Sequence, residues 1–179
     1  PMATPEPPPD LSAINPDYIG WIRIDGTGIN YPVVQGADNK KYLDTTFAGE
    51  KNAAGTIFMD TKCADGFAAP LAILYGHNMK DGSMFAALNR YLDAEYRREH
   101  PAIEIATAEG ETLRYRILTA QVTDIYDEAY SLPEAGADAL ADYAQSIGAE
   151  KDTPLLILST CTDAGGKDKR LLVHAVLEK

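Results

Sequence analysis

The chain has 179 residues and a mass of 19.4 kDa, a length that suits one domain burying about 70% of its unfolded surface. Hydrophobic residues make up 45% of it and charged residues 24%, which is the composition of a globular protein. The formal net charge of −11 argues against nucleic acid as a partner, because binding to phosphate backbones depends on clusters of Lys and Arg.

The first ten residues are rich in proline and differ from the rest of the chain. We expect residues 1–10 to form a stiff linker, or the remnant of a removed segment, and residues 11–179 to form a single domain. No apolar run of about 18 residues and no charged-then-apolar leader occurs, so a membrane anchor or signal peptide is not expected within these residues.

Short apolar or alternating segments predict seven or eight β-strands. The expected strands lie at residues 21–24, 30–34, 55–59, 71–75, 103–107, 112–123, 155–161 and 170–177. A turn signal at residues 25–28 joins the first two into a hairpin, and Pro32 indicates an edge position. Because helices occur only as insertions between these strands, the pattern favours a mainly β fold, a closed or nearly closed barrel, over a βαβ sheet.

Helices are expected at four places along the chain. Residues 11–15 predict a short helix before Pro16, and Ser83 resembles the N-cap of a helix that carries Phe85, Leu88 and Leu92 on one side. Asp93 resembles the N-cap of another short helix, which ends at His100. The apolar spacing over residues 140–147 predicts an amphipathic helix closed by Gly148.

The strand over residues 155–161 starts with four consecutive aliphatic residues and ends in Cys161. Such a run is typical of a strand buried on both faces, and Ser159 and Cys161 share one of them because side chains alternate. A thiol at the end of a rigid strand, open to a loop, suits a nucleophile. The alternative is a small buried hydrophobic residue, the commonest role of a lone cysteine.

Two other side chains suit chemistry at a strand end. His77 follows an apolar strand and a glycine, where an imidazole can exchange protons near neutral pH, although a solvent-facing loop histidine has the same setting. Arg170 opens the last strand and could hold an oxyanion or lie at the surface. His100 is interpreted as a helix C-cap and His174 as a satisfied histidine in a strand wall.

The two cysteines, Cys63 and Cys161, allow one disulfide or two free thiols. Their spacing matches no metal site, and the three histidines are isolated from one another, so we expect no metal and no cofactor.

The residues around this candidate site resemble those of sortases. Residues 158–161, Leu-Ser-Thr-Cys, are similar to the sortase signature, with Arg170 on the next strand and His77 in a Gly-His-Asn setting. Five segments, in the order of the family, resemble class B sortases: residues 18–22, 26–27 with 29–33, 38–39 with 42–43, 55–58 and 75–79. The helix over residues 140–147 is similar to the one that this class inserts before the cysteine strand.

The resemblance implies a sortase-type closed barrel of seven to eight strands with an N-terminal helical extension. It also implies a cysteine transpeptidase on the extracytoplasmic face of a Gram-positive cell, held by an N-terminal anchor that precedes this chain. Cys161 would be the nucleophile, His77 the proton donor and acceptor, and Arg170 the oxyanion partner. The enzyme would cleave the sorting signal of a secreted surface protein after Thr, and transfer the protein to an amine of the cell-wall peptide or of a pilin.

Roles in a substrate groove are implied for Asn39, Leu43, Tyr130 and Ser159, while Asp163 fits an acidic residue of some relatives without an assigned role. Two alternatives remain open at this point. A cysteine protease or amidase would use the same Cys-His pair for hydrolysis. A surface scaffold domain would instead join Cys63 to Cys161 in a structural disulfide.

Overall fold

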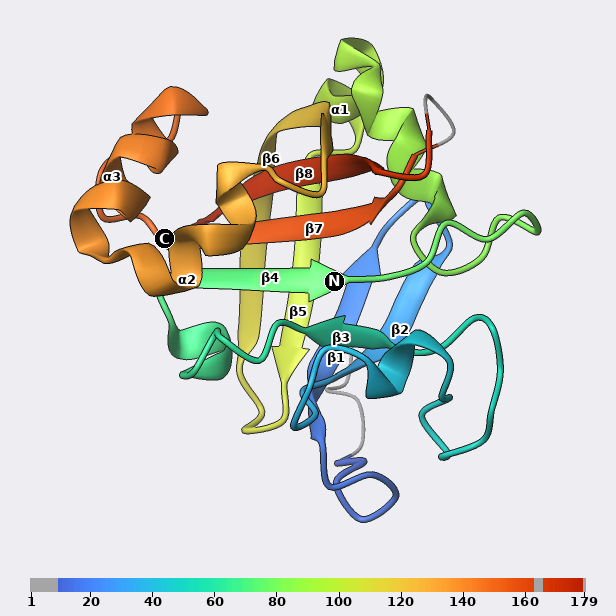
Figure 1. The fold of residues 1–179 in the computed structure, drawn as a ribbon. Coiled ribbons are helices and arrows are strands. Elements are labelled where there is room, and N and C mark those ends of the chain that lie inside the picture. Colours follow the sequence, from blue (N-terminus) through green and yellow to red (C-terminus); the bar gives the residue numbers. More distant parts are fainter. Residues whose placement is uncertain (1–9, 163–165, 179) are drawn as a thin grey trace, which may run out of the picture.

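The computed structural model describes residues 10–162 and 166–178. Within them, eight strands form one closed β-barrel, which confirms the predicted architecture (Figure 1). The strands are β1 Tyr18–Ile24, β2 Ile29–Val34, β3 Ile57–Met59, β4 Leu71–Tyr75, β5 Ala102–Thr107, β6 Thr112–Asp124, β7 Leu155–Cys161 and β8 Lys169–Leu177. Each of the eight predicted segments forms a strand, with ends shifted by a few residues at most.

The strands follow the order β1-β2-β3-β4-β7-β8-β6-β5 around the barrel. The β2–β3 and β4–β7 pairs are parallel, and the other neighbours are antiparallel. Figure 1 shows β4, β7 and β8 side by side, with the arrowheads of β4 and β7 pointing the same way. The C-terminal ends of β4 and β7 therefore meet at one end of the barrel, together with the start of β8.

The helices are short and lie in the connections between strands. The α-helices are α1 Ala94–Glu99, α2 Leu132–Ala135 and α3 Ala137–Ser146, and the 3₁₀ helices are η1 Lys41–Leu43, η2 Gly66–Ala68, η3 Ala86–Leu92 and η4 Glu128–Ser131. None of the helices in the described ranges is long and apolar enough to cross a bilayer. The segment from η4 to α3 joins β6 to β7 and packs on the outside of the barrel.

Two of the predicted helices have the expected ends and faces. Asp93 is the N-cap of α1, where its carboxylate accepts the backbone N–H groups of Glu95 and Tyr96, and His100 is the C-cap. In α3, Tyr143 and Ala144 are buried against the barrel, so the apolar spacing marked the correct face.

At the other two places the structure does not have the predicted α-helix. Residues 11–15 make one hydrogen-bonded turn, in which the Leu11 carbonyl accepts the N–H groups of Ile14 and Asn15, rather than a helical extension. The segment after Ser83 is the 3₁₀ helix η3, which starts at Ala86, and Leu92 is 40% exposed on it. Tyr91 is buried in its place.

The barrel interior is filled by aliphatic side chains of all the strands. Residues 155–160 of β7 are buried without exception, as the apolar run predicts. One face of β7 points into the barrel and the other faces the η4 to α3 segment. This dense packing on both faces leaves only the end of β7 open to solvent.

Candidate active site

Cys161 is the last residue of β7 and its only exposed position. The six residues before it are buried, so the strand fixes the Cα of Cys161 while the thiol faces solvent. On the neighbouring strand, Arg170 is the direct register partner of Cys161. The sulfur and the guanidinium thus start from adjacent positions on two paired strands, whose spacing is about 4.8 Å.

His77 reaches the same end of the barrel from β4. The parallel register pairs Tyr75 of β4 with Ser159 of β7, and the Gly76 N–H continues the ladder by donating to the Ser159 carbonyl at 3.2 Å. His77 and Cys161 each lie two residues beyond this last pair, so both lie at the same end of the barrel. We call the end of the barrel formed by His77, Cys161 and Arg170 the reactive edge.

Two hydrogen bonds to backbone groups and the tight packing of Gly76 fix His77 within its loop. Its Nε2 lies 2.6 Å from the Leu43 carbonyl oxygen, and because a carbonyl only accepts, Nε2 carries the proton and Nδ1 is the basic nitrogen of the neutral ring. The His77 carbonyl accepts the Phe85 N–H at 2.8 Å. Before it, Gly76 leaves no room for a side chain, since a Cβ there would lie 2.5 Å from the Ile57 side chain and 2.7 Å from the Phe85 ring.

The Arg170 guanidinium is held by the start of its own strand. Its Nη1 donates to the carbonyls of Lys167 at 2.9 Å and Lys169 at 2.8 Å. Tyr130 lies close to it: burial raises the pKa of the Tyr130 phenol, while the hydrogen bond with Ser159 and the positive charge of Arg170 oppose that rise. The negative charge of a Cys161 thiolate would raise it further, which places Tyr130 within electrostatic reach of both reactive-edge groups.

The predicted groove residues take different positions. Leu43 is 43% exposed beside His77, and Tyr130, in η4, is close enough to Arg170 and Cys161 for their charges to act on its phenol. Ser159 is buried, with its hydroxyl 2.8 Å from the Tyr130 hydroxyl, so it holds Tyr130 rather than facing solvent. Asn39 uses its side-chain oxygen to accept the Thr61 N–H at 2.9 Å, which ties two loops together. Asp163 lies outside the described residues.

The structure also brings in residues that the sequence analysis missed. The Tyr31 hydroxyl accepts the Met84 N–H at 2.9 Å and thereby anchors the loop that follows His77. Asp60 is buried and accepts a hydrogen bond from the Tyr75 hydroxyl. Both are contacts between segments far apart in the sequence, and no local pattern signals them.

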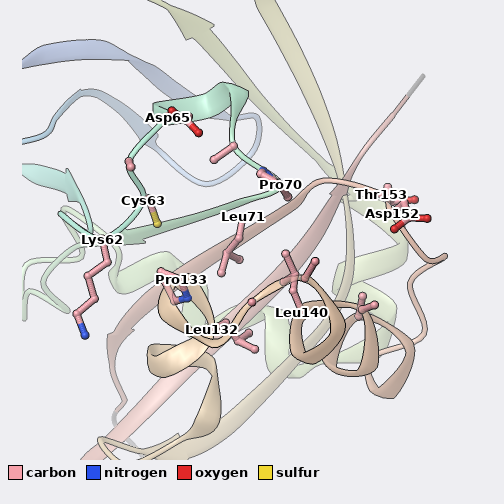
Figure 2. A pocket seen from close by; sticks show the side chains of 16 residues that line it. Lys62, Cys63, Asp65, Pro70, Leu71, Leu132, Pro133, Leu140, Asp152 and Thr153 are labelled. Atoms are coloured by element: carbon pink, nitrogen blue, oxygen red, sulfur yellow. The ribbon is translucent and has the colours of Figure 1, made fainter.

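Cys63 and Cys161 are both free thiols, so the disulfide-bridged scaffold alternative is wrong. Burial raises the pKa of the Cys63 thiol to about 11, so this thiol is not ionised at neutral pH and does not compete with the exposed Cys161 as a nucleophile. Cys63 instead lies in the wall of a cavity of about 420 Å³, shown in Figure 2, between residues 62–71 and the α2–α3 segment. That cavity adjoins the start of β4, the opposite end of the strand from the reactive edge.

The other two histidines have structural positions, as predicted. His174 is fully buried in β8, and its Nε2 lies 2.6 Å from the Tyr143 hydroxyl of α3. Burial lowers the pKa of His174 to about 4, partly opposed by the negative charge of Asp127 and by the Thr119 backbone. In the described ranges, His, Cys, Asp and Glu side chains form no group of three or more that could hold a metal ion.

A closed barrel that gathers an exposed thiol, an imidazole and a guanidinium at one end defines a candidate cysteine enzyme. Comparison with known proteins supplies the family. The family model for the sortase domain matches residues 22–178, and the chain therefore belongs to the sortase family, whose members are cell-surface transpeptidases.

Similar proteins identify the class within the family. The chain is 35% identical to sortase B of Listeria monocytogenes over 94% of this chain and 72% of that protein. A Staphylococcus aureus sortase B–substrate complex has a TM-score of 0.82 at 30% identity, covering 94% of this chain and 83% of that one. A class B sortase of Streptococcus pyogenes involved in pilus biogenesis has a TM-score of 0.81 at 26% identity, covering 94% and 96%. The protein is a class B sortase by sequence and fold.

Proposed function

We propose that this sortase cleaves the sorting signal of a secreted surface protein after Thr and transfers the protein to an amine. Cys161 is the nucleophile, His77 the general acid and base, and Arg170 the oxyanion partner. The observation that carries the proposal is the register of β4, β7 and β8, which brings these three residues to the reactive edge. Residues 11–179 form the catalytic domain.

In the first half-reaction, His77 Nδ1 takes the proton of the Cys161 thiol, and the sulfur attacks the carbonyl carbon of Thr in the bound peptide. The C–N bond breaks, a thioester to Cys161 forms, and the leaving amine takes a proton from His77. In the second half-reaction, His77 accepts a proton from the incoming amine as it attacks the thioester, and the Cys161 sulfur leaves. Arg170 stabilises the oxyanion in both halves, since a guanidinium has five N–H donors and keeps its charge.

The Leu43 carbonyl acts as the third member of this arrangement. By accepting the proton on His77 Nε2, it fixes the ring so that Nδ1 is the nitrogen that exchanges a proton. A base that is itself oriented by a third group is the usual arrangement around an activated nucleophile. In this case the orienting group is a backbone oxygen, so no side-chain substitution at residue 43 removes it.

The substrate and acceptor follow from the relatives. A substrate complex exists for the Staphylococcus aureus sortase B, which supports a peptide substrate for this chain. The acceptor is an amine of the cell-wall peptide, with a pilin amine as the other source, given the pilus role of the Streptococcus pyogenes relative. Because sortases are cell-surface enzymes, we place its action on the extracytoplasmic face of a Gram-positive cell.

The test is an analysis of products from peptides of Asn-Pro and Leu-Pro type, with and without a glycine oligomer as the amine. We expect cleavage after Thr and, when the amine is present, a new amide between the peptide and the amine. Free acid as the only product in the presence of excess amine would instead indicate a cysteine protease or amidase. Cys161→Ala is the control, and turnover that persists in this variant would contradict the mechanism.

A further inference from the structure

A buried carboxylate lies close to the reactive edge but outside it. Asp60 directly follows β3 and is 4% exposed. Its Oδ2 accepts the Tyr75 hydroxyl at 2.6 Å, and its Oδ1 accepts the Lys62 N–H at 2.9 Å. Burying a carboxylate is costly unless it is hydrogen-bonded, so these contacts fix both the carboxylate and its partners.

The partner of this carboxylate, Tyr75, is the last residue of β4 and lies two residues before His77. Its ring contacts two other aromatic rings. The Phe58 ring is tilted by 37° at a centroid distance of 5.2 Å, and the Tyr130 ring stacks at 6.2 Å with an interplanar angle of 17°. We call these three rings, from β3, β4 and η4, the stack, and the hydrogen bond to Asp60 fixes the ring that contacts both others.

Tyr130 is the outer ring of the stack and the one that reaches the reactive edge. Its hydroxyl bonds the Ser159 hydroxyl, and it lies within electrostatic reach of Arg170 and Cys161. Tyr130 belongs to the connection between β6 and β7, so it is held to the barrel by tertiary contacts. The Tyr75 ring and the Ser159 hydroxyl both contact the Tyr130 side chain, which also packs against the main core.

We propose that Asp60 is a positioning residue, which acts through Tyr75 to hold Tyr130 as a wall of the peptide site beside Cys161. The proposal rests on the proposed function for the peptide and on the described contacts for the positioning. Two sets of contacts then have different roles at the same end of the barrel. The β4–β7–β8 register positions the reacting groups, whereas the stack from Asp60 to Tyr130 shapes the place where the peptide binds.

The test uses Asp60→Asn and Tyr75→Phe, which keep the shape of each side chain and weaken the bond between them. We expect the KM for the sorting peptide to rise by about tenfold, the loss expected of one hydrogen bond to a charged group, with kcat changed less than about twofold. In a Tyr130→Ala background, Asp60→Asn should no longer change KM, because its effect passes through Tyr130. Alkylation of Cys161 by iodoacetamide should keep its rate in both variants.

Tyr91→Phe is the matched control, because it removes the hydroxyl of another hydrogen-bonded tyrosine, which donates to the His100 carbonyl at 3.0 Å, away from the edge. It should lower stability without changing KM. Hydrogen exchange of the η4 amides gives a readout that needs no turnover, and it should become faster in Asp60→Asn and not in Tyr91→Phe.

An unchanged rate of hydrogen exchange at the η4 amides in Asp60→Asn would overturn the proposal, whether or not the protein turns over a peptide. An equal rise in KM in the control, or in the Tyr130→Ala background, would overturn it as well. Failure of the wild-type protein to acylate Cys161 would overturn the proposed function alone, since the exchange measurement would still report on the positioning of Tyr130.

Discussion

Acid is expected to weaken this fold through one buried histidine. His174 is 0% exposed in β8, and its ring bonds the Tyr143 hydroxyl of α3. Burial lowers the pKa of His174 from 6.5 to about 4, so the folded protein keeps this ring neutral at a pH where the unfolded chain protonates it. Between these two values the unfolded state binds more protons, and the free energy of unfolding must fall as the pH falls.

The size of the effect follows from the two pKa values. Above pH 6.5 the ring is neutral in both states, and the buried neutral ring costs no stability. As the pH falls from 6.5 toward 4, only the unfolded chain protonates, and the free energy of unfolding falls. The unfolded chain gains about 2 kcal/mol from this protonation between pH 7 and pH 5, and about 3 kcal/mol by pH 4. A loss of this size is a large fraction of the stability of an ordinary domain.

The assay is urea unfolding from pH 7 to pH 4, followed by circular dichroism, for the wild type and His174→Gln. Glutamine can still bond Tyr143 but does not titrate, so the variant should lose about 2 kcal/mol less than the wild type between pH 7 and pH 5. Tyr143→Phe is the control, because it removes the hydrogen bond and keeps the titrating ring, and it should keep the steep dependence. Parallel curves for the wild type and His174→Gln would refute the reasoning.

Three further substitutions test the supports of the site and the fold. Gly76→Ala should lower the free energy of unfolding by about 1 to 3 kcal/mol and reduce peptide turnover, because its Cβ would overlap the Ile57 and Phe85 side chains. Wild-type turnover in this variant would show that the loop before His77 adapts to the added methyl group. Arg170→Lys should lower kcat about a hundredfold, since an ammonium does not reproduce the planar guanidinium, and an unchanged kcat would remove Arg170 from oxyanion stabilisation. Asp93→Ala should cost about 1 kcal/mol in urea unfolding without changing kcat, and an unchanged midpoint would show that the cap of α1 contributes nothing.

Local sequence patterns predicted the strands well because their signals are short-range. The apolar run of residues 155–161 corresponds to β7 with the same bounds, and Asp93 caps α1 as predicted. Each of these predictions depends on residues within one element. The pairing of β4 with β7 does not, since it joins segments about 80 residues apart. That His77 and Cys161 lie at the same end of the barrel could be expected from their places at strand ends and from the family resemblance, but not from any local pattern.

The segment after Ser83 shows why a local signal can mislead. An N-cap side chain must accept a backbone N–H of the first helical turn, but the Ser83 hydroxyl donates to Asp81. The two N–H groups that its side chain could accept have other partners: the Phe85 N–H donates to the His77 carbonyl, and the Ala86 N–H donates to the backbone carbonyl of Ser83. The Met84 N–H, in turn, bonds the Tyr31 hydroxyl. Because tertiary contacts hold the His77 loop in this way, Ser83 does not cap a helix, and the 3₁₀ helix η3 starts only at Ala86.

The central claim is that Cys161 acts as the nucleophile at an edge shared with His77 and Arg170. Mass spectrometry of the intact protein, quenched soon after mixing with a panel of sorting peptides, tests it most directly. The account predicts a mass gain equal to the peptide acyl group, mapped to Cys161 after digestion and absent in Cys161→Ala. An adduct on Cys63, or no adduct with any peptide of the panel, would contradict it.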